Sequence, residues 1–178
     1  MGVGALDTVT GPTEDFVDFL EAHQTGLLRF AMVLTGDAAL AADVVADVLD
    51  RVFERWAAIA VTDKQLAYVR RMVVNDYLSW RRGRRRLVPL AGIPETIDVT
   101  TDHAETHAER TEMLQRLAAL PSRQRATLVL RYYQGLSDAE IAGTLGCSQS
   151  TVRSNASRAL AALRIAMHPL VPSLTKEI

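Results

Sequence analysis

The chain has 178 residues, 48% hydrophobic side chains and a formal net charge of −1, which describes a globular protein of one large or two small domains rather than a disordered one. It contains one cysteine, which excludes an internal disulfide framework and favours a reducing, cytoplasmic location. No apolar run approaches the ~20 residues that a membrane span needs, and no signal-peptide pattern opens the chain.

The small net charge hides an uneven distribution of charge along the chain. Residues 1–66 hold 4 basic and 11 acidic side chains, and residues 67–87 hold 7 and 1. Residues 88–112 hold 1 basic and 6 acidic side chains, and residues 113–178 hold 8 basic and 3 acidic ones. Two basic segments separated by an acidic one indicate two contacts with a polyanion, and the acidic first segment indicates a different partner.

The first part of the chain predicts a tail followed by two helices. Residues 1–12 are small and polar, and from Thr13 apolar residues recur at helical spacing until Gly36. Asp37 is placed to cap the next helix, which is expected over residues 38–60. At ~100° per residue, one side of that helix is apolar and the opposite side is acidic. The apolar side holds Val44, Val45, Val48, Leu49, Val52, Phe53 and Trp56, and the acidic side holds Asp43, Asp47, Asp50 and Glu54.

A third helix is expected from about Asp63, and it ends in a basic run. Its apolar residues at helical spacing are Leu66, Val69, Val73, Tyr77 and Trp80, and the run comprises Arg81, Arg82, Arg84, Arg85 and Arg86. Aromatic rings beside arginines suit unstacked bases and phosphates. The same pattern also suits a solvated helix end whose two rings lie in the core.

The rest of the chain predicts a linker and a second helical unit. Residues 88–107 contain two prolines, a glycine and β-branched residues without a helical stripe. Further helices are expected near residues 108–119, 122–134, 138–145 and 149–167. Because no segment shows strand alternation, the expected fold is all-α, with two small helical domains joined by a linker. The domains are expected over residues 13–87 and 108–170, with a second tail over 171–178.

The last two helices have the features of a helix-turn-helix. Ser137 and Glu140 form an S-x-x-E capping box, Gly146 permits the positive φ of a tight turn, and Ser148 can cap the final helix. Polar side chains at the start of that helix would face outward, where a helix-turn-helix contacts base edges. They are Gln149, Ser150, Thr151, Arg153, Ser154, Asn155 and Arg158. A plain helical hairpin with a polar surface is the alternative.

The residue pattern argues against an enzyme and against a metal site. The sequence contains no glycine-rich phosphate loop or nucleophile elbow, and Cys147 has no histidine at motif spacing. The acidic helix has no histidine of the kind that helical di-metal sites use, and His103 and His107 lack a third ligand. No catalytic residue, metal or cofactor is therefore expected. The acidic side is either a solvated face or a docking surface for a basic partner.

Together these segments resemble the extracytoplasmic-function (group IV) sigma factors of the sigma-70 superfamily. Their residues are similar to those of an actinobacterial subgroup. AADVVADVLDRVFERW is similar to region 2.2 of that family, which docks on the clamp helices of the RNA polymerase β′ subunit. AYVRRMVVNDYLSWRR is similar to regions 2.3–2.4, which open and read the minus-10 promoter element. LPSRQRATLVLRYYQGLSDAEIAGTLGCSQSTVRSNASRAL is similar to region 4, which reads the minus-35 element.

The resemblance implies an alternative sigma factor that binds core RNA polymerase and directs promoter-specific transcription initiation. The implied partners are the polymerase core, through its β′ clamp helices and β flap, promoter DNA and an anti-sigma factor. The implied core-polymerase contacts are Asp43, Asp47, Asp50, Arg51 and Glu54. The implied minus-10 contacts are Arg70, Arg71, Asn75, Tyr77, Trp80, Arg81 and Arg82, and the minus-35 contacts are the seven polar side chains of the final helix.

Four positions depart from the family pattern. Ala46 replaces a common glutamine, and Ser79 replaces a frequent aspartate. Asn155 replaces an arginine or histidine, and Ser150 replaces a common glycine.

Two other classes of protein share some of these features. A regulator with a LuxR-type helix-turn-helix would usually have an α/β domain upstream, whereas residues 14–86 show no strand pattern. An adaptor without DNA contact would not need the basic run or the polar final helix.

Overall fold

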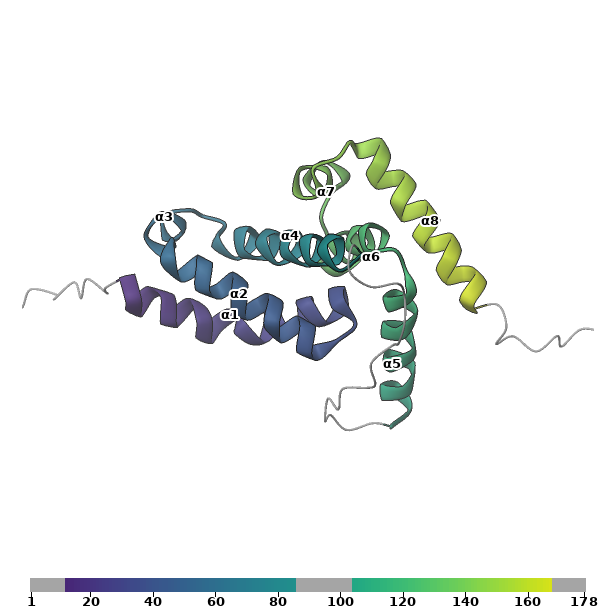
Figure 1. The fold of residues 1–178 in the computed structure, drawn as a ribbon, viewed down its shortest axis with the longest axis horizontal. Coiled ribbons are helices and arrows are strands. Elements are labelled where there is room, and N and C mark those ends of the chain that lie inside the picture. The colour runs from purple at the N-terminus through teal and green to yellow at the C-terminus, as the bar shows by residue number, and fades with distance from the viewer. Residues whose placement is uncertain (1–11, 86–103, 168–178) are drawn as a thin grey trace, which may run out of the picture.

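The computed structural model describes residues 12–85 and 104–167, and every regular element in those ranges is helical, as the sequence predicted (Figure 1). The predicted tails, except for Pro12, and most of the predicted linker lie outside the described residues, and a helix begins at Ala104, inside the predicted linker. The side chains of Arg84, Arg85 and Arg86 and those of His103 and His107 also lie outside the described residues. None of the helices in the described ranges is long and apolar enough to cross a membrane.

The first four helices form an N-terminal bundle. They are α1 (Pro12–Thr35), α2 (Ala38–Glu54), α3 (Trp56–Ala60) and α4 (Gln65–Arg85). The turn between α1 and α2 uses Gly36, whose φ of 70° is a conformation that favours glycine. The predicted cap is confirmed, because Leu40 N–H donates to Asp37 Oδ1 over 2.9 Å.

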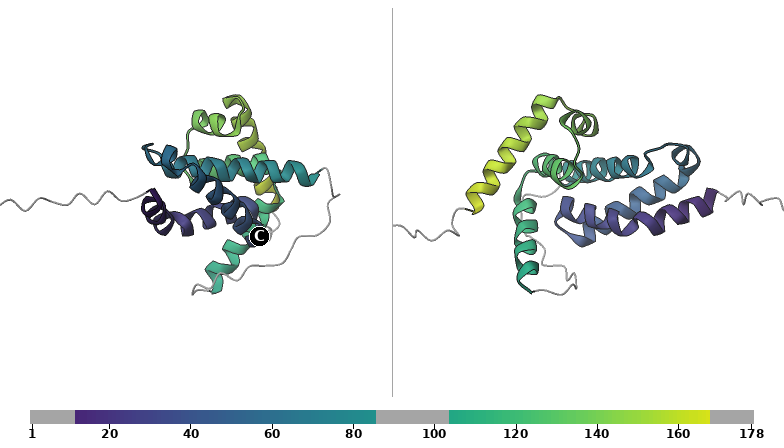
Figure 2. Two further views of the ribbon diagram at one scale, coloured as in Figure 1. Left: turned by 60° about the vertical axis from the view of Figure 1, so that its left-hand side comes forward. Right: turned by 180° about the vertical axis from the view of Figure 1, so that it is seen from behind.

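The core of the bundle is the apolar side of α2, held between α1 and α4, and the three helices lie side by side in each view (Figure 2). Val48 and Val52 of α2 have no exposed surface, and neither have Phe30 of α1 and Val73 of α4. Burying one such side chain contributes roughly 1.5–3 kcal/mol to folding. The bundle therefore rests on the apolar stripe that the sequence identified.

The prediction of one continuous helix over residues 38–60 is wrong, because the chain breaks at Arg55. That residue has φ −115° and ψ 13°, outside helical values, and α3 starts immediately after it. The break turns Trp56 into the core, where its ring centre lies 5.2 Å from that of Phe16 and 4.9 Å from that of Phe19. Phe53, predicted on the buried side, is 52% exposed.

The second half of the described chain is a C-terminal unit that contains the helix-turn-helix. It consists of α5 (Ala104–Ala119), α6 (Ser122–Leu128), the π-helical segment η1 (Val129–Tyr133), α7 (Asp138–Leu145) and α8 (Gln149–Met167). The predicted capping box is present, since Glu140 N–H donates to Ser137 Oγ and Ser137 N–H donates to Glu140 Oε2. Gly146, between α7 and α8, has the predicted positive φ, at 60°.

A π turn replaces the end of the helix predicted over residues 122–134. Gln134 N–H donates to Val129 O over 3.2 Å, five residues back, instead of the usual four. The chain then leaves the helix at Gly135, where φ is 68°. This wider turn ends at Tyr133, whose ring faces Phe30 of the N-terminal bundle.

The N-terminal bundle and the C-terminal unit pack directly against each other. Helix α4 contacts α6 and α7, and α1 contacts α5 (Figure 1). Val129 and Ile141 belong to the same cluster of buried side chains as Phe30 and Val73. The two predicted domains thus share one hydrophobic core.

Candidate functional site

Helix α8 presents a polar face at its N-terminal end. Val152, Ala156 and Ala159 are buried against the rest of the C-terminal unit, which leaves the other sides of the helix open. Of the seven side chains predicted to contact the minus-35 element, five are exposed and two are half-buried. The exposed ones are Gln149, Ser150, Thr151, Arg153 and Arg158, and the half-buried ones are Ser154 and Asn155.

The turn before α8 is held by hydroxyl groups. Thr151 N–H donates to Ser148 Oγ over 3.2 Å, so Ser148 caps the helix as predicted. Ser148 Oγ also lies 2.8 Å from Ser150 Oγ and 2.9 Å from Thr151 Oγ1. These bonds hold the first turn of α8 at the surface, where its hydroxyls and free N–H groups can meet phosphate.

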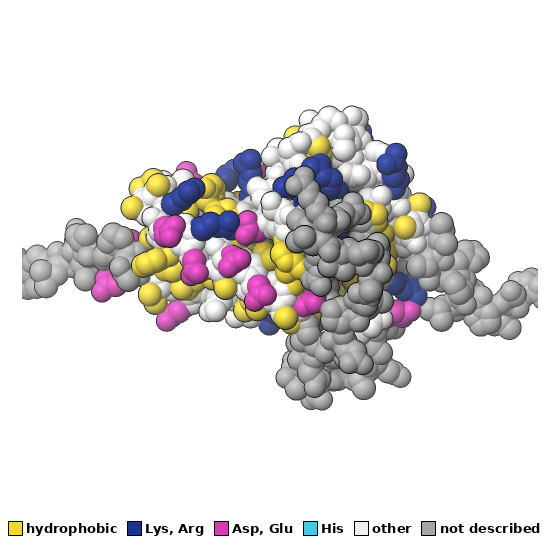
Figure 3. All heavy atoms as spheres, viewed as in Figure 1, with side chains coloured by type: hydrophobic (Ala, Val, Ile, Leu, Met, Phe, Trp, Pro, Cys, Tyr) yellow, Lys and Arg dark blue, Asp and Glu magenta, His cyan; other side chains and the backbone are white. Residues whose placement is uncertain are grey.

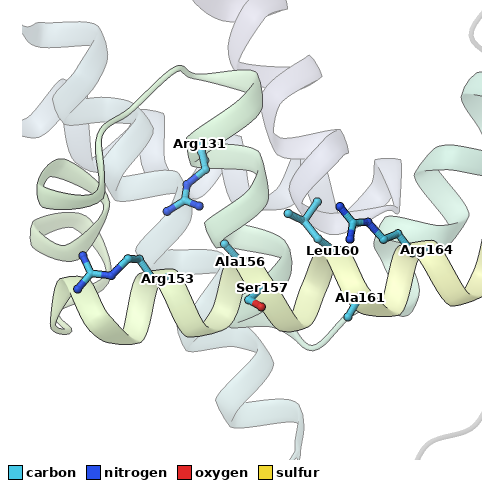
Figure 4. A pocket seen from close by; sticks show the side chains of 7 residues that line it. All are labelled: Arg131, Arg153, Ala156, Ser157, Leu160, Ala161 and Arg164. Carbon is cyan, nitrogen blue, oxygen red and sulfur yellow. The ribbon is translucent and has the colours of Figure 1, made fainter.

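A basic groove runs along one flank of α8 (Figure 4). Its volume is about 350 Å³, and we call it the arginine groove. It is lined by Arg131, Arg153, Ala156, Ser157, Leu160, Ala161 and Arg164. Arg131 forms an ion pair with Asp138, and Arg153 Nη1 lies 3.9 Å from the same carboxylate. Because the groove is lined by three arginines and this one aspartate lies near two of them, the groove keeps a positive charge.

The sequence analysis did not single out Arg131 and Arg164. Arg164 follows Arg153 by eleven residues, or about three helical turns, so the two lie on one side of α8. That spacing was a usable signal. Arg131 had no such signal, because it lies on η1 and reaches the groove only through the packing of that segment against α7.

Helix α4 carries the residues predicted to contact the minus-10 element. Arg71, Asn75 and Arg82 are exposed. Arg70, Trp80 and Arg81 are partly buried. The open part of this surface is therefore smaller than that of α8.

Tyr77, which the family resemblance assigns to the minus-10 element, does not lie on the open surface of α4 but in the core, the alternative that the sequence had left open for this ring. Its side chain is 1% exposed, and burial raises the pKa of its hydroxyl. The guanidinium carbon of Arg125, from α6, lies 5.9 Å from the centre of the Tyr77 ring. The ring lies inside the shared core because α4 is packed on two sides, by the N-terminal bundle and by the C-terminal unit.

The four acidic side chains of α2 form an exposed row, which we call the acidic stripe. Asp43, Asp47, Asp50 and Glu54 are all exposed, and Ala46 beside them is exposed too. Acidic side chains gather over the part of the surface formed by α1 and α2 (Figure 3). The stripe lies opposite the buried valines of α2, so its charges are not used in packing the bundle.

Arg51, predicted to contact the polymerase, is engaged in an ion pair within the N-terminal bundle. Its guanidinium forms an ion pair with Asp76 of α4. The pair joins α2 to α4 and balances the charge of Arg51. This side chain remains partly exposed beside the acidic stripe, so the predicted contact of Arg51 with the polymerase stays a prediction.

A helix-turn-helix whose exposed face is polar and flanked by arginines defines a DNA-binding protein. The N-terminal bundle of the same chain adds a separate acidic surface. Residues 110–163, which span most of the C-terminal unit, match the family model "Sigma-70, region 4". The chain is 37% identical to an RNA polymerase sigma-E factor of Streptomyces avermitilis, with 86% of each chain covered. It is 33% identical to the ECF RNA polymerase sigma factor SigL of Mycobacterium tuberculosis, over 84% of this chain and 87% of that relative.

Solved structures show the same fold. The sigma factor RpoE of Bartonella quintana, in complex with the anti-sigma factor NepR, superposes with a TM-score of 0.68 at 22% identity. That match covers 86% of this chain and 97% of the other. The chain belongs to the extracytoplasmic-function sigma factors of RNA polymerase, and the resemblance noted in the sequence is confirmed.

Proposed function

We propose that this protein binds core RNA polymerase and directs transcription initiation from promoters that carry its own minus-10 and minus-35 elements. The main support for the proposal is that a chain of this family carries two separate candidate binding surfaces. The reading face of α8 and the acidic stripe of α2 lie on different units, so DNA and polymerase can be bound together.

The minus-35 element is assigned to α8 and the arginine groove. Asn155 can pair bidentately with adenine, and Arg153 can read guanine or hold a phosphate. Arg131 and Arg164 line the flank of the helix and suit phosphate contacts, which position the protein without reading sequence. Residues 108–170 would form the region 4 domain.

The minus-10 element is assigned to the exposed part of α4. Arg71, Asn75 and Arg82 offer hydrogen bonds to bases and phosphates, and Trp80 and Arg81 lie beside them. Stacking of an unpaired base on an aromatic ring is worth ~1–3 kcal/mol, which favours a strand that has been opened. Residues 13–87 would form the region 2 domain.

The polymerase is assigned to the acidic stripe. Four exposed carboxylates attract a basic partner and repel DNA, so this face suits a protein rather than a promoter. The family resemblance points to the clamp helices of β′ for this surface and to the β flap for the region 4 domain. A factor that works on polymerase and promoter DNA would act in the cytoplasm.

An anti-sigma factor is the proposed regulatory partner. The structures of RpoE with NepR and of CnrH with the cytosolic domain of CnrY each place a fold of this kind in a complex. Both are under 25% identical to this chain, so they indicate the kind of partner and not its identity.

In vitro transcription tests the proposal. Core RNA polymerase from an actinobacterium would be given fragmented genomic DNA, with and without the purified protein, and the 5′ ends of the transcripts sequenced. The protein should create a set of start sites that share two upstream elements. Tight, sequence-specific DNA binding by the protein alone, with no new start sites, would instead identify a LuxR-type regulator.

A further inference from the structure

A carboxylate on α7 lies between two arginines of the arginine groove. Asp138, the first residue of α7, forms an ion pair with Arg131 of η1 through its Oδ1 atom. Its other oxygen, Oδ2, lies 3.9 Å from Nη1 of Arg153 on α8. One side chain therefore connects the segment before the helix-turn-helix with both helices of the helix-turn-helix.

The two ion pairs of Asp138 differ in strength. The side chains of Arg131 and Asp138 are only 25% and 27% exposed, so their pair is shielded from water and holds both groups in place. Arg153 is 62% exposed, and 3.9 Å is longer than a hydrogen bond. An open pair of this kind contributes little to stability. The contact with Asp138 therefore orients Arg153 without occupying its hydrogen-bond donors.

Helix α7 keeps the carboxylate of Asp138 in this position. Asp138 follows Ser137, which caps the helix, and it lies in the first helical turn, where the helix dipole favours a negative charge. The ion pair with Arg131 fixes the same side chain from η1. The acceptor that faces Arg153 is thus itself held in place, which a group that orients a neighbouring side chain requires.

The guanidinium of Arg153 has donors left for DNA. A guanidinium carries five N–H donors in a planar fork, and Asp138 lies beside Nη1 of Arg153. The edge formed by Nε and Nη2 can still donate two parallel hydrogen bonds, the arrangement that recognises O6 and N7 of guanine. The carboxylate also repels a phosphate that approaches the same arginine. Both effects favour contact with a base edge over contact with the DNA backbone.

The other end of the arginine groove lacks such a carboxylate. Arg153 lies at the end of the groove nearest the start of α8, and Arg164 lies at the opposite end (Figure 4). Arg164 is exposed, and none of the acidic side chains in the described part of the chain forms an ion pair with it. A phosphate therefore meets no competing anion at Arg164, whereas at Arg153 it meets Asp138.

We propose that Asp138 is a positioning residue that helps to set the sequence preference of the helix-turn-helix. It orients Arg153 toward a guanine of the minus-35 element and keeps that arginine from a backbone phosphate. Asp138 acts through Arg153 and does not itself contact DNA. The inference rests on the proposed function, because it takes α8 as the helix that reads the minus-35 element. It adds to that function the base that Arg153 recognises and the group that selects it.

Asp138→Asn tests the proposal, because it keeps the size of the side chain and removes its charge. Transcription by the polymerase complex from templates randomised across the minus-35 element, followed by sequencing of the products, gives the base preference at each position. Asp138→Asn should lower the preference for guanine at one position roughly two- to tenfold, which corresponds to the cost of ordering one long side chain. The affinity for promoters that lack this guanine should rise, because an anion has been removed beside the DNA.

Two matched variants separate this role from a general effect of charge. Glu112→Gln removes the same charge from an exposed residue of α5 that pairs with Arg116, and it should leave the base preference unchanged. Arg153→Ala combined with Asp138→Asn should show the same preference as Arg153→Ala alone, because the effect of Asp138 passes through that arginine. A further loss of preference in the double variant would overturn the proposal.

A conservative variant covers the possibility that Asp138→Asn disturbs the fold of α7. Asp138→Glu keeps the negative charge in the first turn of the helix and moves the carboxylate by one methylene group. It should lower the preference for guanine without raising the affinity for other promoters. An unchanged preference in the folded Asp138→Asn and Asp138→Glu proteins would overturn the positioning role.

Two other outcomes would contradict the proposal in distinct ways. Lower stability in urea together with weaker binding to every sequence would make Asp138 a structural residue of the helix-turn-helix. Tighter binding with an unchanged preference would make it a source of charge repulsion only. Both results leave the start sites created by the unaltered protein in place, whereas the absence of those start sites would contradict the proposed function itself.

Discussion

The two units of this protein carry their DNA-facing helices in different ways. Helix α8 is packed on one side, so the side chains predicted to read DNA remain at the surface or half-buried. Helix α4 is packed on two sides, by the N-terminal bundle and by α6 and α7, and Tyr77 is buried as a result. Tyr77 also belongs to the apolar stripe of α4, so a match to a family motif identifies a binding surface only where the side chain stays exposed after packing.

The largest expected effect is the loss of stability on replacing Tyr77, which tests whether this ring is buried between the two units. Tyr77→Ala removes a large buried ring at the contact between the units, and truncation of such residues costs about 3–5 kcal/mol. Urea denaturation should show this loss in the free energy of unfolding. Tyr132→Ala, at an exposed ring, should change it by less than about 0.5 kcal/mol. A Tyr77→Ala protein as stable as Tyr132→Ala would place the ring outside the core.

Asn155 tests the exposed face of α8, where a substitution should alter the preference for DNA sequence and leave folding unchanged. Asn155→Ala should relax the preference at one minus-35 position, because a good bidentate base contact gives ~1–3 kcal/mol of discrimination. Transcription from templates randomised across the minus-35 element, followed by sequencing of the products, would measure it. An unchanged preference at every position would remove Asn155 from base reading.

The acidic stripe tests the other surface of the N-terminal bundle. Asp47→Lys combined with Asp50→Lys should weaken binding to core polymerase about tenfold, more at low salt, through charge repulsion. Both side chains are exposed, so the helical circular dichroism should not change. Asp15→Lys combined with Asp18→Lys, at two exposed acidic residues of α1, changes the net charge by the same amount and is the control. Equal affinities of the two reversed proteins would show that the stripe is not a specific contact.

The capping box of α7 offers a smaller effect in the C-terminal unit. Ser137→Ala should cost about 1 kcal/mol of stability through loss of the cap. Hydrogen bonds from Ser137 lower the pKa of Glu140, so that carboxylate stabilises the fold at neutral pH. Its contribution is lost as the pH falls through the lowered pKa. Acid unfolding of Ser137→Ala should show less of this dependence, and an identical pH profile would contradict the assignment.

The smallest expected effect is at the end of the arginine groove. Arg164→Ala should weaken binding of the polymerase complex to all promoters about equally and reduce the salt dependence of that binding by about one counterion. Affinity measured on two unrelated promoters at several salt concentrations would test this. A loss confined to one promoter sequence would make Arg164 a base-reading residue instead.

Much of the candidate site could be predicted because it depends on local rules. The cap at Asp37, the capping box at Ser137 and the positive φ of Gly146 all follow from short-range hydrogen bonds and sterics. The break at Arg55 could not be predicted in this way. It depends on how Trp56 fits between Phe16 and Phe19, which lie on another helix.

The sequence by itself determined the all-α fold, the helix-turn-helix, the acidic stripe and the polar face of α8, because helical periodicity and capping act over a few residues. Only the tertiary structure decided that Arg51 pairs with Asp76, that Arg131 joins the arginine groove and that Arg125 of α6 donates to a carbonyl at the end of α1. Each of these contacts links side chains or carbonyls on different elements. Such pairings depend on how helices pack, and a periodic pattern in one helix carries no information about the charge that a neighbouring helix brings to it.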